Sequence, residues 1–249
     1  MSLLNKILFY MLSLIIILSV WEFIALAISR AYFPTPIEVF ERVYIDLANT
    51  ILITNLAISL QRIFLALAIA LISGLLLGIS ATWSSRISRS IISNLILLTY
   101  PIPHITLLPI FFFFLGVEWS KIALLSLITF YPIALSVMEW SSRFPRDLSD
   151  LIFLMRGDKL HIIRYVVLPS ALPGILTGFR IALNTAFAVI FIVESLVGSG
   201  GIGYLIYLYW QKLDYTGMYA SIAFLSLVGI SLYLLLKSAE HRLLKWLYR

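Results

Sequence analysis

Two ionisable residues stand within long apolar stretches of this sequence, where a charge is costly. Arg180 lies inside the stretch 171–197, and Glu194 lies near its end. In the middle of a membrane such a residue costs about 2.5–3.5 kcal/mol on insertion scales, so each needs polar surroundings. They are 14 residues apart, or about 21 Å along a helix axis, which is too far for them to pair with each other.

Arg180 is open to three interpretations. It lies about 14 Å into its apolar stretch, deep enough to reach a central cavity and attract an anionic solute. It could equally clamp helix-end carbonyls, or extend its long side chain to the membrane surface. Glu194 precedes a flexible glycine-rich turn at 198–203. That turn neither follows a strand nor opens a βαβ unit, so it does not predict a dinucleotide site.

Catalytic and cofactor-binding motifs are absent from the sequence. It has no phosphate-binding G-x-x-x-x-G-K-[ST] loop and no H-E-x-x-H zinc motif. It also has no Cys, which excludes disulfides and thiolate metal sites. The three histidines, His104, His161 and His241, are scattered. We therefore expect no enzyme activity, metal or cofactor on this chain.

The composition places these residues in a membrane. Hydrophobic residues make up 61% of the chain and charged residues 12%, with a mean hydropathy of +1.03. A soluble core needs only about half of the residues to be apolar. The net charge of +6 is more typical of residues that set membrane orientation than of a nucleic-acid site. We expect one all-α integral membrane domain over residues 1–249.

Apolar windows of about 20 residues predict six membrane-spanning helices. They lie at 7–28, 61–83, 90–117, 121–138, 171–197 and 215–236. The first is longer than the apolar core of a signal peptide, about 7–15 residues, so we expect a retained span. The third is broken by Pro101, Pro103 and Pro109. These prolines indicate either a kinked helix that lines a pathway or irregular packing, and Pro103 joins Arg180 and Glu194 as a candidate pathway residue.

Basic residues between the spans predict the orientation, because they concentrate on the cytoplasmic side. With both termini in the cytoplasm, 12 basic residues fall inside and 4 outside. The inner set is Lys6, Arg86, Arg89, Arg143, Arg146, Arg156, Lys159, Arg164, Lys237, Arg242, Lys245 and Arg249. The outer set is Arg30, Arg42, Lys121 and Lys212. The segment 139–170 is therefore predicted to be a cytoplasmic loop.

Two further patterns predict helix packing. Gly74 and Gly78 form a G-x-x-x-G pair in the second span, which would let a helix of the same chain or of a second copy approach closely. Between the first two spans Val39, Val43 and Leu47 recur at i, i+4 and i+8. This spacing is typical of an amphipathic helix at the membrane interface.

The loop 139–170 has an internal pattern of its own. Spacings of i, i+3, i+4 and i+7 predict a short helix whose apolar stripe contains Leu148, Leu151, Ile152 and Met155. Gly157 suits the C-terminal cap of that helix. A second short helix would then run to a stop at Pro169, and Pro173 would fit the first turn of the next span. Such a loop could dock into a groove on a partner or rest on anionic lipid.

The same loop resembles the cytoplasmic EAA loop of ABC importer permeases. That loop reads E-A-A, three residues, G, nine residues, then I-x-L-P. The corresponding positions here hold Asp150, Leu151, Ile152, Arg156, Val166, Leu168 and Pro169. Arg156 replaces the small turn residue, and Gly157 could make the turn one position later. These departures from the EAA pattern affect which ATPase is bound, and how strongly it is coupled to the permease, more than they affect the fold.

The resemblance extends along nearly the whole chain, to the sulfonate/taurine/nitrate-type permeases of ABC importers. The matching blocks are FPTPIEVF at 33–40, SLQRIFLALAIALISGLLLGIS at 59–80, YPIPHITLLPIFFFFLG at 100–116, LPSALPGILTGFRIAL at 168–183 and VESLVGSGGIGYLI at 193–206. Several separate blocks in the same order are a far more specific signal than one short motif.

The resemblance implies a function and a set of partners. The chain would be the translocation subunit of an importer for a small anionic or vitamin-like solute, in the cytoplasmic membrane of a prokaryote. Two copies, two ATPase subunits and an external binding protein would assemble, with ATP hydrolysis on the separate ATPase. A coupling helix between spans 4 and 5 would contact that ATPase. The coupling residues implied are Leu148, Asp150, Leu151, Ile152, Met155, Arg156, Gly157 and Pro169.

An ion-coupled secondary transporter is the main alternative. That class tends to show internal repeats and several ionisable residues along an ion route. Here no repeat is evident, and only Glu22, Arg180 and Glu194 lie deep in predicted spans. A membrane enzyme is less consistent with the sequence, which lacks a convergent cluster of His, Asp, Glu or Cys.

Overall fold

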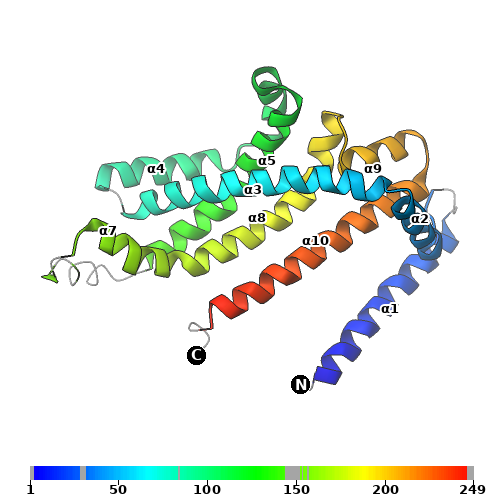
Figure 1. Ribbon diagram of the computed structural model, residues 1–249, viewed down its shortest axis with the longest axis horizontal. Helices are drawn as coiled ribbons and strands as arrows, with labels where there is room; N and C mark the ends of the chain where they lie inside the picture. The colour runs from blue at the N-terminus through cyan, green and yellow to red at the C-terminus, as the bar shows by residue number, and fades with distance from the viewer. Residues whose placement is uncertain are drawn as a thin grey trace.

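The computed structural model describes residues 3–28, 32–83, 85–143, 152, 154–155 and 157–245, and it is helical throughout this part (Figure 1). The elements are α1 (Leu3–Ala27), α2 (Pro36–Ala48), α3 (Ile51–Trp83), α4 (Arg86–Thr99), the 3₁₀ helix η1 (His104–Leu107), α5 (Leu108–Ser142), α7 (Lys159–Ile162), the π-helical turn η2 (Ile163–Val167), α8 (Leu168–Leu196), α9 (Ile202–Gln211) and α10 (Tyr215–Leu243). The predicted all-α class is confirmed.

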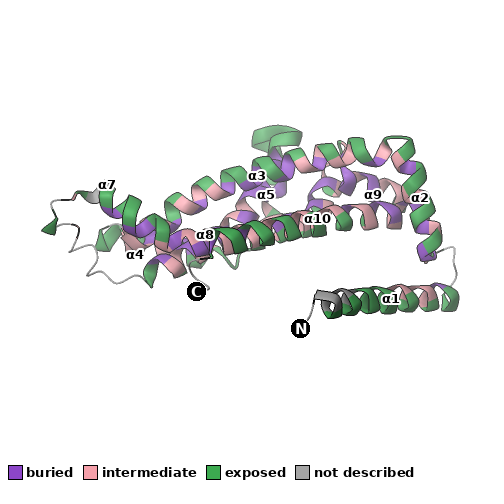
Figure 2. Cartoon of the chain, turned by 60° about the horizontal axis from the view of Figure 1, so that its bottom comes forward, coloured by how far each residue is buried: buried purple, intermediate pink, exposed green. Residues whose placement is uncertain are grey.

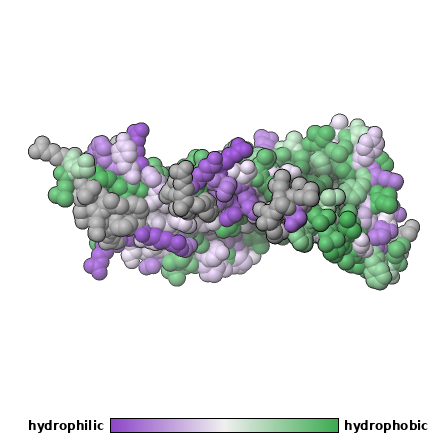
Figure 3. Space-filling view, turned by 90° about the horizontal axis from the view of Figure 1, so that it is seen from below, coloured by the Kyte–Doolittle hydropathy of each residue, from purple (hydrophilic) through white to green (hydrophobic). Residues whose placement is uncertain are grey.

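Several helices have the length and composition of membrane spans. Among the described residues, four segments are long and apolar enough to cross a bilayer: 51–83, 104–142, 163–196 and 215–243. α1 adds a helix of 25 residues, and exposed residues cover most of its length (Figure 2). Figure 3 shows broad hydrophobic areas on the outside of the molecule. Such a surface suits contact with lipid or with another membrane chain.

α5 packs between α3 and α8 through glycines on both neighbours. A Cβ added to Gly78 of α3 would lie 2.9 Å from the Val137 side chain. A Cβ added to Gly178 of α8 would lie 2.8 Å from the Ile133 Cα. Gly74 is equally tight against Ile133. The G-x-x-x-G pair therefore serves packing within this chain, one of the two roles that the sequence left open.

The hydrophobic core lies where these three helices meet. Its fully buried members include Ile63 and Leu67 of α3, Leu125 and Ile133 of α5, and Ile190 of α8. α9 and α10 close one side of this core, α9 through its buried Ile202 and α10 through Leu225. α1 contributes little, because it contacts the rest of the chain mainly beside α2 (Figure 1). The three-helix centre thus positions the other elements.

The predicted third span, 90–117, is divided in the structure. α4 ends at Thr99, and the proline-rich turn and η1 separate it from α5, whose first turn contains Pro109. A second break, at Gly116, has φ +72° and ψ −175°. No neighbouring atom crowds this glycine, so the left-handed backbone alone favours glycine there. The prolines predicted the first break, whereas the second depends on one glycine.

The apolar stripe of α2 faces the core of the protein. Val39 is 0% exposed, and Val43 and Leu47 pack against the core. The spacing predicted a helical face correctly, and that face packs on the protein. The placement of the helix at the membrane interface stays a prediction. Ile37 and Tyr44 point outward instead, with 67% and 75% exposure.

Charged contacts of Arg42 with Asp46 and Asp214 hold α2 against α9 and α10, which explains the orientation of α2. Arg42 donates to Asp46 at 3.0 Å and to Asp214, the N-cap of α10, at 2.8 Å. The Tyr209 hydroxyl donates to Asp46 at 3.0 Å. Burial alone would lower the pKa of Arg42, but Tyr209 and the two carboxylates outweigh it and hold that pKa above its ordinary value. Arg42 therefore stays charged.

The segment that follows the predicted coupling helix is continuous with α8. α7, η2 and α8 join without a non-helical residue between them, since Ile162, Val167 and Leu168 all have right-handed helical angles. The prediction that Pro169 stops a separate helix was wrong. Pro169 lies inside this continuous helical run, close after the π-helical turn, where it removes one amide donor without ending the helix, and Pro173 lies further inside α8.

A larger side chain at Gly78 should push α3 away from α5. We expect Gly78→Leu to lower the free energy of unfolding by about 1–3 kcal/mol, the usual cost of overpacking a filled core. Val137 and the Ala134 carbonyl already lie within 3.0 Å of the added Cβ. Thermal unfolding in detergent measures the change, and Ala68→Leu, exposed on the same helix, is the control. Equal losses in the two variants would contradict this packing.

Candidate functional site

A buried carboxylate and a buried guanidinium meet near the end of α8. Glu194 of α8 is 0% exposed, and Arg62 of α3 is 2% exposed. Arg62 donates to Glu194 over 2.7 Å. The Ser59 hydroxyl donates to the same carboxylate at 2.9 Å, and the Gly203 amide donates to it at 2.8 Å. Glu194 is therefore a fully satisfied charge at the junction of α3, α8 and α9.

Glu118 of α5 extends this cluster toward the surface. Arg62 donates to both Glu118 oxygens, at 2.9 and 2.8 Å, and the Glu118 side chain is 51% exposed. Lys121 is fully buried one turn further along α5, and it donates to Ser199 at 2.5 Å and to Glu118 at 3.4 Å. Lys121 thus belongs to the group of Arg62, Glu118, Lys121 and Glu194, called the ion cluster below. The count of basic residues placed it instead in an outer connection between spans.

The glycine-rich turn 198–203 wraps over the ion cluster. Gly200 and Gly201 have φ values of 79° and 104°, in the left-handed region that favours glycine. Arg62 donates to the Gly200 carbonyl at 2.7 Å. A Cβ on Gly201 would overlap the Glu194 carboxylate. These glycines therefore allow the backbone to approach a buried ion pair, which is the structural use of the G-x-G-G-x-G pattern.

Sequence reasoning found Glu194 but missed its partners. A usable signal was present, because three ionisable residues stand at the ends of three different predicted spans. Arg62 begins 61–83, Lys121 begins 121–138, and Glu194 ends 171–197. The predicted orientation puts all three ends on the same side of the membrane. Charges at one depth on packed helices are expected to meet, since an unpaired buried charge is costly.

Arg180 has a partner of its own, on α10. Its Nε lies 3.5 Å from the Glu240 carboxylate, and the two side chains are 28% and 9% exposed. The Glu240 Oε2 atom has no hydrogen bond within the described part of the chain. Of the three interpretations, the geometry is nearest to a structural clamp, although the clamp joins two side chains and not a side chain to helix-end carbonyls. A role in the solute pathway stays a prediction.

Pro103 lies in the exposed turn between α4 and α5. It is the residue before η1, and its carbonyl accepts the amide and the hydroxyl of Thr106 at 3.0 and 2.7 Å. These bonds let the chain resume a helix directly after the break. Its place in a pathway also stays a prediction.

The coupling loop is described only in part. Leu148, Asp150, Leu151 and Arg156 lie outside the described residues. Of the others, Ile152 is half-buried and packs against a small cluster of Ile162, Val166 and Val167, together with Trp83 at the end of α3. The predicted loop is thus attached to two long helices.

Gly157 closes the turn beside Ile152. Its amide donates to the Ile152 carbonyl at 2.8 Å, a bond across five residues of the kind that ends a helix. A Cβ on Gly157 would lie 2.5 Å from the Ile152 side chain. Met155 and its neighbour Leu154 are 76% and 83% exposed. Two members of the predicted stripe therefore face different ways: Ile152 toward this chain and Met155 outward.

The described residues thus form a helical membrane bundle with a buried ion cluster and a partly exposed apolar loop. A sequence profile of binding-protein-dependent transport system inner membrane components matches residues 74–245. The chain belongs to this family. The permease is therefore a multi-pass inner-membrane subunit of an ABC importer, and ATPase activity resides on a separate nucleotide-binding subunit. This membership decides against an ion-coupled secondary transporter and against a membrane enzyme.

Curated relatives match the permease over most of its length. The formylaminopyrimidine transport permease protein ThiX of Halalkalibacterium halodurans is 33% identical, covering 93% of each chain. The taurine transport system permease protein TauC of Escherichia coli is 29% identical, over 94% of this chain and 88% of its own. A putative aliphatic sulfonates transport permease protein of Bacillus subtilis, SsuC, is 28% identical, over 93% and 84%.

Solved structures share the fold. The MetNI methionine ABC transporter in an inward-facing conformation matches with a TM-score of 0.64 and 24% identity, covering 80% of this chain and 96% of that chain. An amino acid ABC transporter with histidines matches with a TM-score of 0.62 and 16% identity, covering 80% and 97%. At these identities the likeness concerns the fold alone.

Loss of Arg62 should leave the Glu194 charge buried without its main partner. We expect Arg62→Met to lower the free energy of unfolding by about 3–5 kcal/mol, the usual cost of breaking a buried ion pair on one side. Adding Glu194→Gln should recover part of this loss, because the remaining group is then neutral. Chemical unfolding in detergent measures both variants.

Arg143→Met is the matched control for this experiment. Its ion pair with Glu139 is exposed on both sides, at 58% and 61%, and such pairs contribute about 0–1 kcal/mol. Similar losses for Arg62→Met and Arg143→Met, or no recovery in the double variant, would show that the cluster is not a coupled buried unit.

Proposed function

We propose that two copies of the permease form a solute pathway and that each docks one ATPase subunit through the loop 147–169. The observation that carries this proposal is the junction at Ile152. There the loop packs against a cluster of α7 and η2 residues, on which the end of α3 also packs, while the neighbouring Leu154 and Met155 remain exposed. To bind in a groove of an ATPase, the apolar surface must be held in place by the rest of the permease. Contact with lipid alone would not require that support.

The same junction would couple ATP hydrolysis to the pathway. Because α7 and η2 continue into α8, a displacement of the docked loop would move α8 as a rigid body. Closure of the two ATPases would then be converted into alternating access, a shear or hinge motion of packed helices. Asp150 and Arg156 are proposed to lie on the polar edges of the docked surface, as the resemblance implies.

The membrane topology that fits this proposal has six spans with both termini in the cytoplasm. α1, α3, α8 and α10 would each supply one span. α4 together with η1 and the first turns of α5 would make a third, broken span. The part of α5 after Gly116 would return as the fourth, since 26 helical residues follow that break and about 20 suffice.

The solute is proposed to be small, and either anionic or vitamin-like, delivered by an external binding protein. The relatives support this range through the solutes they are named for: formylaminopyrimidine, taurine and aliphatic sulfonates. Binding measurements on the external binding protein of this importer would identify the solute directly.

A charge in the exposed part of the loop should weaken docking of the ATPase. Burying one aliphatic side chain stabilises a complex by about 1.5–3 kcal/mol, so Met155→Asp should lower the affinity about tenfold or more. Co-purification of the ATPase at equal membrane levels of the variants measures this, followed by solute uptake. Ile87→Asp, 75% exposed at the start of α4, is the control. Normal co-purification and uptake with Met155→Asp would refute docking here.

The basic asymmetry of 12 to 4 predicts the location of reporters. A reporter inserted near Arg146, or fused after Arg249, should be cytoplasmic. One inserted near Glu41 or Gly200 should be external. Paired alkaline phosphatase and fluorescent protein fusions distinguish the two sides, because each is active on one side only. An external signal at Arg146 would overturn both the topology and the site of ATPase docking.

A further inference from the structure

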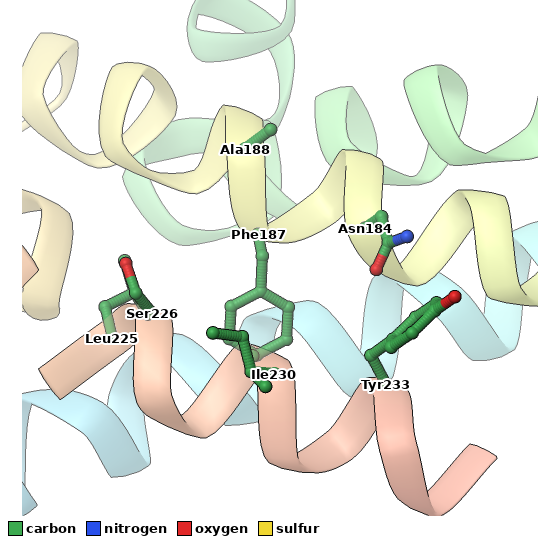
Figure 4. Close-up of a pocket in the computed structure, with 8 residues that line it drawn as sticks. Asn184, Phe187, Ala188, Leu225, Ser226, Ile230 and Tyr233 are labelled. Atoms are coloured by element: carbon green, nitrogen blue, oxygen red, sulfur yellow. The ribbon is translucent and has the colours of Figure 1, made fainter. Parts of the chain in front are cut away.

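A pocket opens between α8 and α10, away from the ion cluster. Its volume is about 500 Å³, within the range of small-molecule sites. Figure 4 shows its walls, in which Asn184 and Phe187 of α8 lie opposite Ile230 and Tyr233 of α10.

Phe187 forms the floor of this pocket. A Cβ added to Gly229 would lie 3.1 Å from the Phe187 ring, so the ring rests directly on the α10 backbone. The absence of a side chain at Gly229 thus sets the depth of the pocket. The flat ring gives it an apolar base on which a planar group could stack.

Asn184 is the unusual residue of this pocket. It is exposed near the middle of the candidate span 163–196, and its amide forms no hydrogen bond with any residue that the structure describes. An unsatisfied amide facing hydrocarbon is costly, and polar residues within spans generally face a cavity or a partner. The position therefore requires a hydrogen-bonding neighbour from outside the described chain.

The hydroxyls of Ser226 and Tyr233, which line the same pocket, also have no hydrogen-bond partner in the described part of the chain. Ser221 and Ser231 of α10 donate to carbonyls four residues back, at 2.9 and 2.7 Å. Ser226 lies between them in the sequence and lines the pocket, yet within the described chain it forms no such bond. The Tyr233 hydroxyl likewise has no partner there. One amide and two hydroxyls are thus left to bind a polar molecule.

The lining carries no net charge. No ionisable acid or base is among the side chains that line the pocket, apart from the weakly acidic Tyr233. The nearest cation along α8 is Arg180, one turn before Asn184, and it faces Glu240 at 3.5 Å. An anion placed here would lose its hydration without gaining an unpaired cation, which is unfavourable in a medium of low dielectric.

We infer that this pocket holds the transported solute on its way across the membrane, and that the solute is an uncharged planar ring with hydrogen-bond donors and acceptors on its edge. The inference rests on the proposed importer function and narrows its solute class. The Asn184 amide offers two donors and an acceptor, the hydroxyls offer both, and the Phe187 ring offers a stacking surface. A sulfonate would match none of these as well.

The absence of native Cys from this chain gives a direct test, because Ser226→Cys introduces the only thiol of the permease. We would treat the complete complex, with its ATPase and reconstituted in proteoliposomes, with a charged methanethiosulfonate that does not cross lipid. We expect Ser226→Cys to react, and formylaminopyrimidine to slow the reaction at least tenfold while taurine does not. Ser231→Cys, exposed on the same helix but outside the pocket, should not react with the charged reagent.

Other results would overturn the inference in recognisable ways. Reaction only with a lipid-soluble maleimide would make the pocket a lipid contact. No reaction, together with a disulfide between Ser226→Cys and Leu14→Cys of a second copy, would mean that α1 of that copy fills it. Protection of the Ser226→Cys thiol by taurine, or by neither taurine nor formylaminopyrimidine, would exclude an uncharged planar ring as the solute class.

A functional variant separates this inference from the proposed function. Asn184→Leu should reduce uptake of formylaminopyrimidine at least tenfold while as much ATPase co-purifies as with the wild type, and Asn184→Gln should restore part of the uptake. Unchanged uptake in Asn184→Leu would refute the pocket and leave the importer function standing. If the wild-type complex hydrolyses ATP but takes up neither formylaminopyrimidine nor taurine, and neither solute protects the thiol introduced by Ser226→Cys, the result would count against both.

Discussion

The buried pair of Arg62 and Glu194 is the constraint on which the arrangement of the helices depends. Two opposite charges without access to water cannot be left half-paired, because either one alone would cost several kcal/mol. The pair therefore fixes α3 against α8 at one depth. Glu118 adds α5 to the same point, and the Gly203 amide adds α9. Hydrophobic packing alone is tolerant of small sliding movements between helices, whereas this cluster allows one register.

Glycine packing and the ion cluster fix different features of the helix bundle. Gly78 and Gly178 bring α3 and α8 close to the two sides of α5, which shortens the distances across the bundle. The ion cluster then sets the longitudinal register at one end. A close approach without a fixed register would leave several arrangements of similar energy. The combination specifies a single one, in the way that polar groups can select among apolar alternatives.

The sequence predicted the helical class, the apolar windows and the family, because each depends on patterns within short segments. The ends of the predicted spans place Arg62 and Glu194 at one depth, but their pairing also depends on helix packing, because the two residues are distant in sequence. The outward or inward direction of the α2 stripe also depended on a distant contact, Arg42 with Asp214. Pro169 was misleading for a different reason: a proline usually ends or kinks a helix, but here the helix continues through it after a π-helical turn.

The unbroken run from α7 through η2 to α8 has a mechanical consequence. It contains 38 residues between Lys159 and Leu196, about 57 Å at about 1.5 Å per residue. A rod of that length that tilts by about 5° around one end moves its other end by about 5 Å. Glu194 lies close to the far end. A small rotation at the Lys159 end would thus produce a larger displacement at the Glu194 end, where the ion cluster holds the chain.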